Sequence, residues 1–104
     1  MAELIVIYWR DIPSQVMARA GRKKARTMLP PRFMEGIDRA AMRAGKGSSD
    51  AYMEDWHRER ETTDADDLQA AVERRAAELA DQFNEEYLER LVKAKGLVAN
   101  LKTD

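Results

Sequence analysis

The sequence has 104 residues and an almost neutral charge, which limits the classes of protein to which it can belong. A chain of this length builds one hydrophobic core, so we expect a single domain over residues 1–96 and a frayed tail over residues 97–104. The 18 Lys and Arg residues balance 19 Asp and Glu residues, which excludes a global charge that attracts nucleic acid or an acidic membrane. The absence of cysteine excludes disulfides, thiolate metal sites and cysteine nucleophiles, and it suits the cytoplasm.

The first predicted element is a buried strand over residues 4–9, a run rich in β-branched and aromatic side chains. The run is too short for the core of a signal peptide, and no stretch approaches the roughly 20 apolar residues of a membrane span. Residues 11–14 supply turn chemistry, because Pro13 presets its φ angle. A return strand over residues 15–19 completes a predicted hairpin that ends at Gly21.

A basic connector follows the hairpin, and two consecutive prolines then mark the start of a helix. The connector, residues 22–28, has no clear preference for strand or helix. Pro30 disfavours helical conformation in the residue before it, whereas Pro31 suits the first position of a helix. Apolar residues at helical spacing over residues 33–44 predict a helix that ends at Gly45.

The stretch over residues 51–62 is compatible with two structures. As a strand, it places on one face Tyr52, Glu54, Trp56 and Arg58. As a helix capped by Asp50, it pairs Tyr52 with Trp56. We favour the strand, because a hairpin of two strands is marginally stable alone and a third strand completes a sheet.

Two further helices are predicted in the C-terminal half. Asp64, Asp66 and Asp67 precede an apolar stripe, and capping at the positive end of a helix explains them better than a paired-carboxylate site does. Asn84 is placed to cap a second helix, which Gly96 closes. The sum is an α+β fold with the order β-β-α-β-α, in which helices pack on one face of a small antiparallel sheet.

The other face of this sheet is a candidate surface for a partner. If helices cover one side, Tyr8, Trp9 or Trp56 stays partly exposed, and exposed aromatic side chains on a sheet are a usual docking place. The predicted partner-binding residues are Tyr8, Trp9, Arg10 and Asp11, since an Arg-Asp pair after two aromatic residues can build a compact recognition edge. Core packing with a turn-stabilising ion pair explains the same residues.

The one lopsided concentration of charge is basic and surrounds Gly21. The residues of this candidate anion-binding site are Arg19, Arg22, Lys23, Lys24 and Arg26. They could grip the phosphate or carboxylate of a nucleotide or folate, or the acidic surface of a partner protein; nucleic acid is less favoured. A solvated loop explains them as well, because no Gly-rich phosphate loop is present.

His57, the only histidine, is the one candidate for proton transfer. It lies between Asp55 and Glu59, and a carboxylate two residues away along a strand can orient an imidazole. Nothing supplies a nucleophile or an oxyanion site beside it, so we expect a solvated histidine and no enzymatic activity. No spacing of metal ligands occurs either, and we predict no metal and no cofactor.

Parts of the chain resemble the family known as the virulence factor domain. The resemblance is carried by residues 7–16, which include Tyr-Trp-Arg-Asp-Ile-Pro, and by Ala-Gly-Arg-Lys at residues 20–23. Arg-Phe at residues 32–33 and the stretch over residues 37–45 also carry it. It covers roughly residues 3 to 60, although this chain has Pro30-Pro31 where the family more often has Ser-Glu or Pro-Glu. It implies an association with folate- and corrinoid-dependent methyl-transfer enzymes of one-carbon metabolism, and it implies no reaction.

We therefore predict a non-catalytic accessory domain that binds a protein partner, with methyl-transfer enzymes as the first class to test. One alternative is a small-ligand module that holds a phosphate or a carboxylate with Arg22, Lys23 and Lys24. The other is an enzyme subunit that uses His57. A short sheet also has edges through which two copies of the chain could pair.

Overall fold

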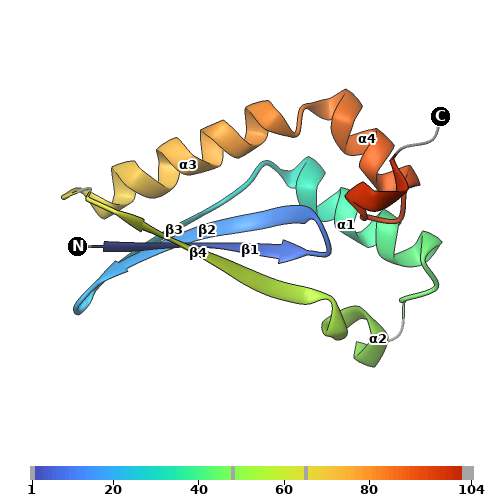
Figure 1. Cartoon of the computed structure of the whole chain (residues 1–104), viewed down its shortest axis with the longest axis horizontal. Coiled ribbons are helices and arrows are strands. Elements are labelled where there is room, and N and C mark those ends of the chain that lie inside the picture. The colour runs from blue at the N-terminus through green and yellow to red at the C-terminus, as the bar shows by residue number, and fades with distance from the viewer. Residues whose placement is uncertain (1, 48, 65, 102–104) are drawn as a thin grey trace.

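The computed structural model describes residues 2–47, 49–64 and 66–101, and it confirms an α+β fold. Four antiparallel strands in these residues form one sheet with the order β3-β2-β1-β4 (Figure 1). The strands are β1 (Ala2–Trp9), β2 (Ile12–Ala20), β3 (Lys23–Met28) and β4 (Trp56–Thr63). The helices are α1 (Pro31–Arg43), α2 (Ser49–Glu54), α3 (Leu68–Gln82) and α4 (Glu85–Lys93), and a 3₁₀ turn follows at Val98–Asn100.

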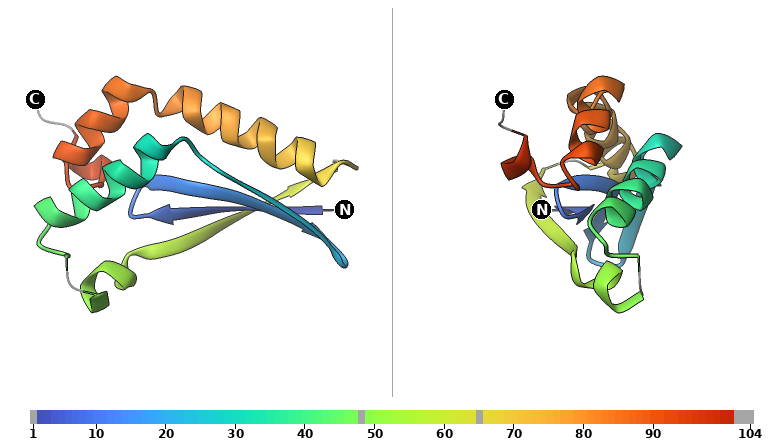
Figure 2. Two further views of the ribbon diagram at one scale, coloured as in Figure 1. Left: turned by 180° about the vertical axis from the view of Figure 1, so that it is seen from behind. Right: turned by 90° about the vertical axis from the view of Figure 1, so that its right-hand side faces the viewer.

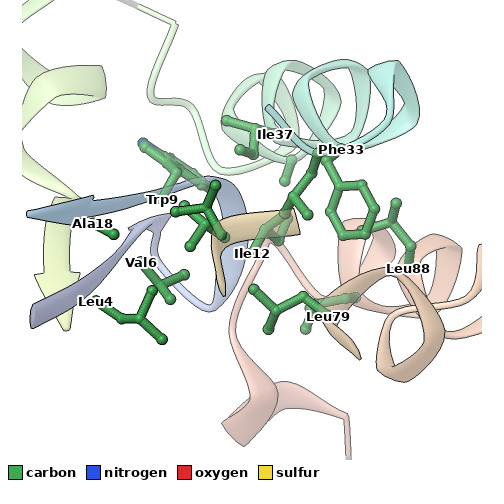
Figure 3. Close-up of a cluster of buried hydrophobic side chains, with 14 of the residues drawn as sticks. Leu4, Val6, Trp9, Ile12, Ala18, Phe33, Ile37, Leu79 and Leu88 are labelled. Carbon is green, nitrogen blue, oxygen red and sulfur yellow. The ribbon is translucent and has the colours of Figure 1, made fainter. Parts of the chain in front are cut away.

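Helix α3 lies along one face of the sheet over β2 and β3, α1 packs against β2 on the same side, and α4 packs against α1 (Figure 2). The core lies between the sheet and this layer of helices. The central strands contribute Leu4, Val6, Val16 and Ala18 to this core. Phe33 and Ile37 of α1 and Leu79 of α3 meet them from the helical layer (Figure 3). Within the described chain, only the short α2 lies on the other side of the sheet, beside the start of β4 (Figure 1).

The strand β3 lies where the sequence predicted only a connector. It pairs with β2 from Ala20 opposite Lys23 to Gln15 opposite Met28, so the chain order begins β-β-β instead of β-β-α. As an edge strand it carries mostly exposed, charged side chains, which protect an edge from unwanted pairing. These charges also remove the apolar alternation by which a strand is recognised.

The turn between β1 and β2 is shorter than predicted. It comprises Arg10 and Asp11, and β2 already begins at Ile12. The pairing of the two strands shifts by one residue at Ser14, which is accommodated as an irregularity in β2.

Residues 49–63 divide between the two structures that the sequence allowed. The segment up to Glu54 is the helix α2, and the pairing of β4 with β1 starts where Trp56 lies opposite Trp9. The rings of Tyr52 and Trp56 nevertheless meet edge to face, with centroids 5.8 Å apart. The favoured strand is therefore present, but it begins five residues later than predicted.

The helix boundaries follow the residues that the sequence singled out. α1 begins at Pro31, as predicted. Asp67 Oδ1 accepts a bond of 3.1 Å from the backbone N of Ala70, and Asn84 Oδ1 accepts one of 2.9 Å from the backbone N of Tyr87. These side chains satisfy amide groups that the first turn of a helix leaves without a partner.

Trp9 organises the packing at the end of β1. Its side chain is fully buried, and its Nε1 donates a hydrogen bond of 2.9 Å to the backbone O of Tyr52. Gly96, with a φ angle of 81°, closes α4 directly against the Trp9 ring. A Cβ atom on Gly96 would lie 3.0 Å from Cζ3 of Trp9, so the position requires glycine for its backbone angle and for its packing.

We predict that Gly96→Ala lowers the free energy of unfolding by about 2 to 3 kcal/mol, because a left-handed alanine is strained and its methyl group clashes with Trp9. Gly21→Ala is the matched control: its φ angle is 61°, and no described atom lies within 4 Å of the added Cβ. It should cost about 1 kcal/mol. Urea unfolding followed by circular dichroism measures both values, and equal losses would show that the contact with Trp9 is not strained.

Candidate partner-binding site

Arg10 and Asp11 tie the turn between β1 and β2 to two distant segments. Arg10 Nε donates to Asp55 Oδ2 at 3.0 Å, and Arg10 Nη1 donates to the backbone O of Lys95 at 2.9 Å. Asp11 Oδ2 accepts a bond of 2.7 Å from the backbone N of Val98. The ion pair of this turn therefore joins Arg10 to Asp55 and not to Asp11. The side chains of Arg10 and Asp11 both stabilise the fold by binding other segments of the chain.

Val98 belongs to the C-terminal tail, residues 97–104, that was predicted from the sequence to fray. Residues 97–101 contain the 3₁₀ turn, and Leu101 is partly buried against the core. Residues 102–104 lie outside the described residues.

Tyr8 and Trp9 do not present free aromatic surfaces. Tyr8 is partly buried against the core on the helix side and stacks on the His57 ring, with centroids 5.4 Å apart and planes 10° apart. Burial raises the pKa of the Tyr8 hydroxyl, and the carboxylate of Glu59 raises it further. Because Trp9 is fully buried, a partner could contact it only after the end of the sheet had opened.

His57 is exposed, but its ring is held on two sides. Its Nε2 lies 2.6 Å from the backbone O of Arg10, and a carbonyl can only accept, so Nε2 donates this bond. Tyr8 packs on the ring face. These contacts give His57 a structural role in joining β4 to the turn, and its role in proton transfer stays a prediction.

The predicted anion-binding residues are divided by the β2–β3 hairpin. Arg19, Lys24 and Arg26 lie on the face of the sheet away from α3, because side chains alternate along a strand. Lys23 lies on the helix side, and Arg22 is exposed in the turn. The five side chains therefore do not converge on one small ligand.

The face of the sheet away from α1, α3 and α4, here called the open face, combines apolar and cationic residues. Its central strands β1 and β2 contribute Ile5, Ile7, Gln15 and Met17. At one end of the same face, Glu3 and Arg19 form an ion pair. Its edge strands contribute Arg58 and Arg60 from β4 and Lys24, Arg26 and Met28 from β3.

Each apolar residue at the centre of the open face lies beside a cation. Arg58 is opposite Ile7 and Arg60 is opposite Ile5 across β1 and β4. Ile5 is only 3% exposed although it takes no part in the core under the helices. The long side chains of its neighbours therefore cover it, as the aliphatic stems of arginines commonly do.

A groove of about 380 Å³ lies at the end of the open face beside α2. Its lining includes Ile7, Gln15, Met53, Trp56 and Arg58. Trp56 is the one predicted aromatic that reaches this surface, where it is partly buried, and Met53 is 64% exposed. The groove gives the open face a recess for an apolar side chain.

Residues 7–92 match a family model that is described as virulence factor. The chain belongs to the virulence factor family. The matched segment runs from β1 into α4 and includes the whole of the Tyr-Trp-Arg-Asp-Ile-Pro stretch, which confirms the resemblance seen in the sequence. No curated protein and no solved structure matches the chain. The family name specifies no reaction, so the function of this virulence factor domain must be argued from its surface.

The described residues of the virulence factor domain contain neither a membrane-spanning helix nor a cluster of metal ligands. None of the helices in the described ranges is both long enough and apolar enough to cross a membrane. The same residues contain no group of three or more His, Asp and Glu side chains that could hold a metal ion.

Arg58 and Arg60 are the surface residues of the virulence factor domain that sequence reasoning undervalued. The alternation Arg58-Glu59-Arg60-Glu61 was the available signal, because in a strand it places two cations on one face and two carboxylates on the other. On the helix side, Glu61 accepts bonds of 3.2 and 3.0 Å from Arg75 of α3. This ion pair orients β4 so that its arginines face away from the helices.

Asp55 fixes the start of β4 to the rest of the site. Burial raises its pKa, but the hydrogen bond and charge of Arg10, together with the charge of Lys46, outweigh burial, so the pKa lies below its ordinary value of 3.8. Lys46 Nζ lies 3.5 Å from Asp55 Oδ2. The ionised carboxylate therefore stabilises the fold at neutral pH.

We predict that Asp55→Asn lowers the free energy of unfolding by about 1 kcal/mol at pH 7, since the amide keeps a hydrogen bond but loses the charge. Because folding lowers the pKa of Asp55, the loss should be complete above pH 3.8 and should fade as the pH drops through the folded-state pKa. Urea unfolding at pH 7 and at acidic pH measures the difference. Glu54→Gln, at a 69% exposed side chain near the same Lys46, is the control and should change little. A pH-independent loss in Asp55→Asn would contradict the assignment.

Proposed function

We propose that this virulence factor domain is a non-catalytic accessory module that binds a protein partner through the open face of its sheet. The observation that carries the proposal is an apolar centre, formed by Ile5, Ile7 and Met17, between two cationic edges. In layered proteins, the apolar face of a sheet packs against a second layer. The described chain supplies that layer on one side only, so a partner is the natural source of the other.

The chemistry of the open face favours protein over nucleic acid. Proteins that bind single-stranded DNA or RNA stack successive bases on several exposed aromatic rings. Among the described residues, Trp56 is the only Trp, Tyr or Phe that lines the groove of this face, and its ring already meets Tyr52 edge to face. Isoleucine and methionine suit the packing of protein side chains, and methionine adapts to irregular partners.

Pairing of two copies through their sheet edges is disfavoured by charge. Side chains that oppose each other across antiparallel strands share a face, so two β4 edges would bring Arg58 near Arg60 of the second copy and Glu59 near the second copy's Glu59 or Glu61. At the β3 edge, Lys24 and the other cations would meet their own copies. Both edges therefore favour a partner of different composition.

The other functions inferred from the sequence stay predictions. A folate or nucleotide at Lys23 and Lys24 would also meet Asp66 and Asp67, which line the same depression and repel an anion. Proton transfer by His57 has no further support from its contacts. The implied link to one-carbon metabolism makes cytoplasmic folate- and corrinoid-dependent methyl-transfer enzymes the first partners to test.

We expect Arg58→Glu combined with Arg60→Glu to weaken partner binding about tenfold or more, because it reverses one charged edge of the open face. Both side chains are exposed, so the variant should stay folded. Arg74→Glu with Arg90→Glu makes the same charge change on exposed positions of α3 and α4 and should bind normally. Affinity capture with the three proteins, followed by titration calorimetry on the identified and purified partner, measures the effect. Equal affinities for all three would exclude the open face as the docking surface.

A further inference from the structure

We infer that the element which docks on the open face is an acidic amphipathic α-helix of the partner, lying between the edge with Arg58 and Arg60 and the edge with Lys24 and Arg26. The inference rests on the proposed function and specifies the chemistry of the partner. Width, charge and the layout of the opposite face support it.

The spacing of the two cationic edges matches the width of a helix. The edges lie on β4 and β3, three strand spacings apart, which is about 14 Å. The strip of the open face between these edges, over β1 and β2, is here called the trough. An α-helix with its side chains is about 10 to 12 Å wide, so it fits within the trough and reaches both edges. A single extended strand occupies one strand spacing of about 5 Å and could reach one edge only.

The length of the open face also suits an ordinary helix. From Trp56 to Thr62 the β4 edge spans six residue steps, or about 20 Å. A helix of about 13 residues covers the same length. On the opposite face, the 15-residue α3 already lies along the sheet in this way, and a partner helix would complete a helix–sheet–helix sandwich (Figure 1).

The positive charge along the trough favours a partner helix that carries carboxylates. Glu3 is the only carboxylate among the described residues of the open face, and it is already paired with Arg19 at 2.9 Å and with Arg60 at 3.8 Å. Lys24, Arg26 and Arg58 have no ion-pair partner within the described chain. Carboxylates along both flanks of a docked helix would pair with them.

The apolar stripe of such a helix has a defined place to pack. Ile7 and Met17 form the floor of the trough, and the groove beside Met53 and Trp56 takes one larger side chain at its end. An amphipathic helix presents an apolar stripe between polar flanks, which is the pattern that this surface complements.

The test is an NMR titration of the isotopically labelled full chain with a synthetic helical peptide of about 14 residues that carries leucines on one stripe and glutamates on both flanks. We expect saturable shifts at the backbone amides of Ile5, Ile7 and Arg58, with about tenfold tighter binding than a scrambled peptide of the same composition. Arg58→Glu with Arg60→Glu should weaken the helical peptide about tenfold, and Arg74→Glu with Arg90→Glu should not.

Several outcomes overturn the inference. Equal affinity for the scrambled peptide, shifts confined to α3 and α4, tighter binding of a single-stranded oligonucleotide, or self-association through the trough in sedimentation experiments would each do so. Suppose that Arg58→Glu with Arg60→Glu loses the captured partner while the helical peptide binds no better than its scrambled form. The partner then does dock on the open face, but the docking element is not an acidic amphipathic helix. If the variant keeps the partner, docking on the open face is itself wrong.

Discussion

The rest of the structure depends on a central strand that is apolar on both sides. In β1, Leu4 and Val6 face the helices, while Ile5 and Ile7 face the other way. A continuous apolar run is typical of strands that are covered on both faces. Helices α1, α3 and α4 lie on one side of the sheet, and α2 reaches the other side only beside the start of β4. Ile5 and Ile7 are therefore shielded mainly by neighbouring side chains. The open face is thus a consequence of the composition of β1.

The stretch by which the family is recognised explains the fold better than it explains binding. Trp9, Arg10 and Asp11 bring together the start of β4, the end of α4 and the turn between the first two strands. Gly96 completes the contact by allowing the chain to pass against the indole ring. A motif with this many internal partners marks a shared architecture, whereas function lies on the surface that the architecture leaves free.

The sequence predicted those elements whose signals are local. Proline at position 31 and the caps Asp67 and Asn84 act on the nearest backbone groups, so these boundaries could be located without the fold. β3 could not be recognised, because an edge strand needs charges where a pattern search needs apolar residues. The burial of Trp9 and the division of the basic residues between two faces depend on strand pairing, which no single segment encodes.

The arginines of the open face serve the free and the bound state in different ways. In the free domain, the stems of residues such as Arg60 keep water from Ile5, which limits the exposed apolar area. Their charged ends remain available to carboxylates, and charge complementarity mainly increases the rate and specificity of association. Most of the binding free energy must then come from apolar contacts with Ile7, Met17 and the groove beside Trp56, once the stems have turned aside. Flexible arginine and methionine side chains can make this change without any movement of the sheet.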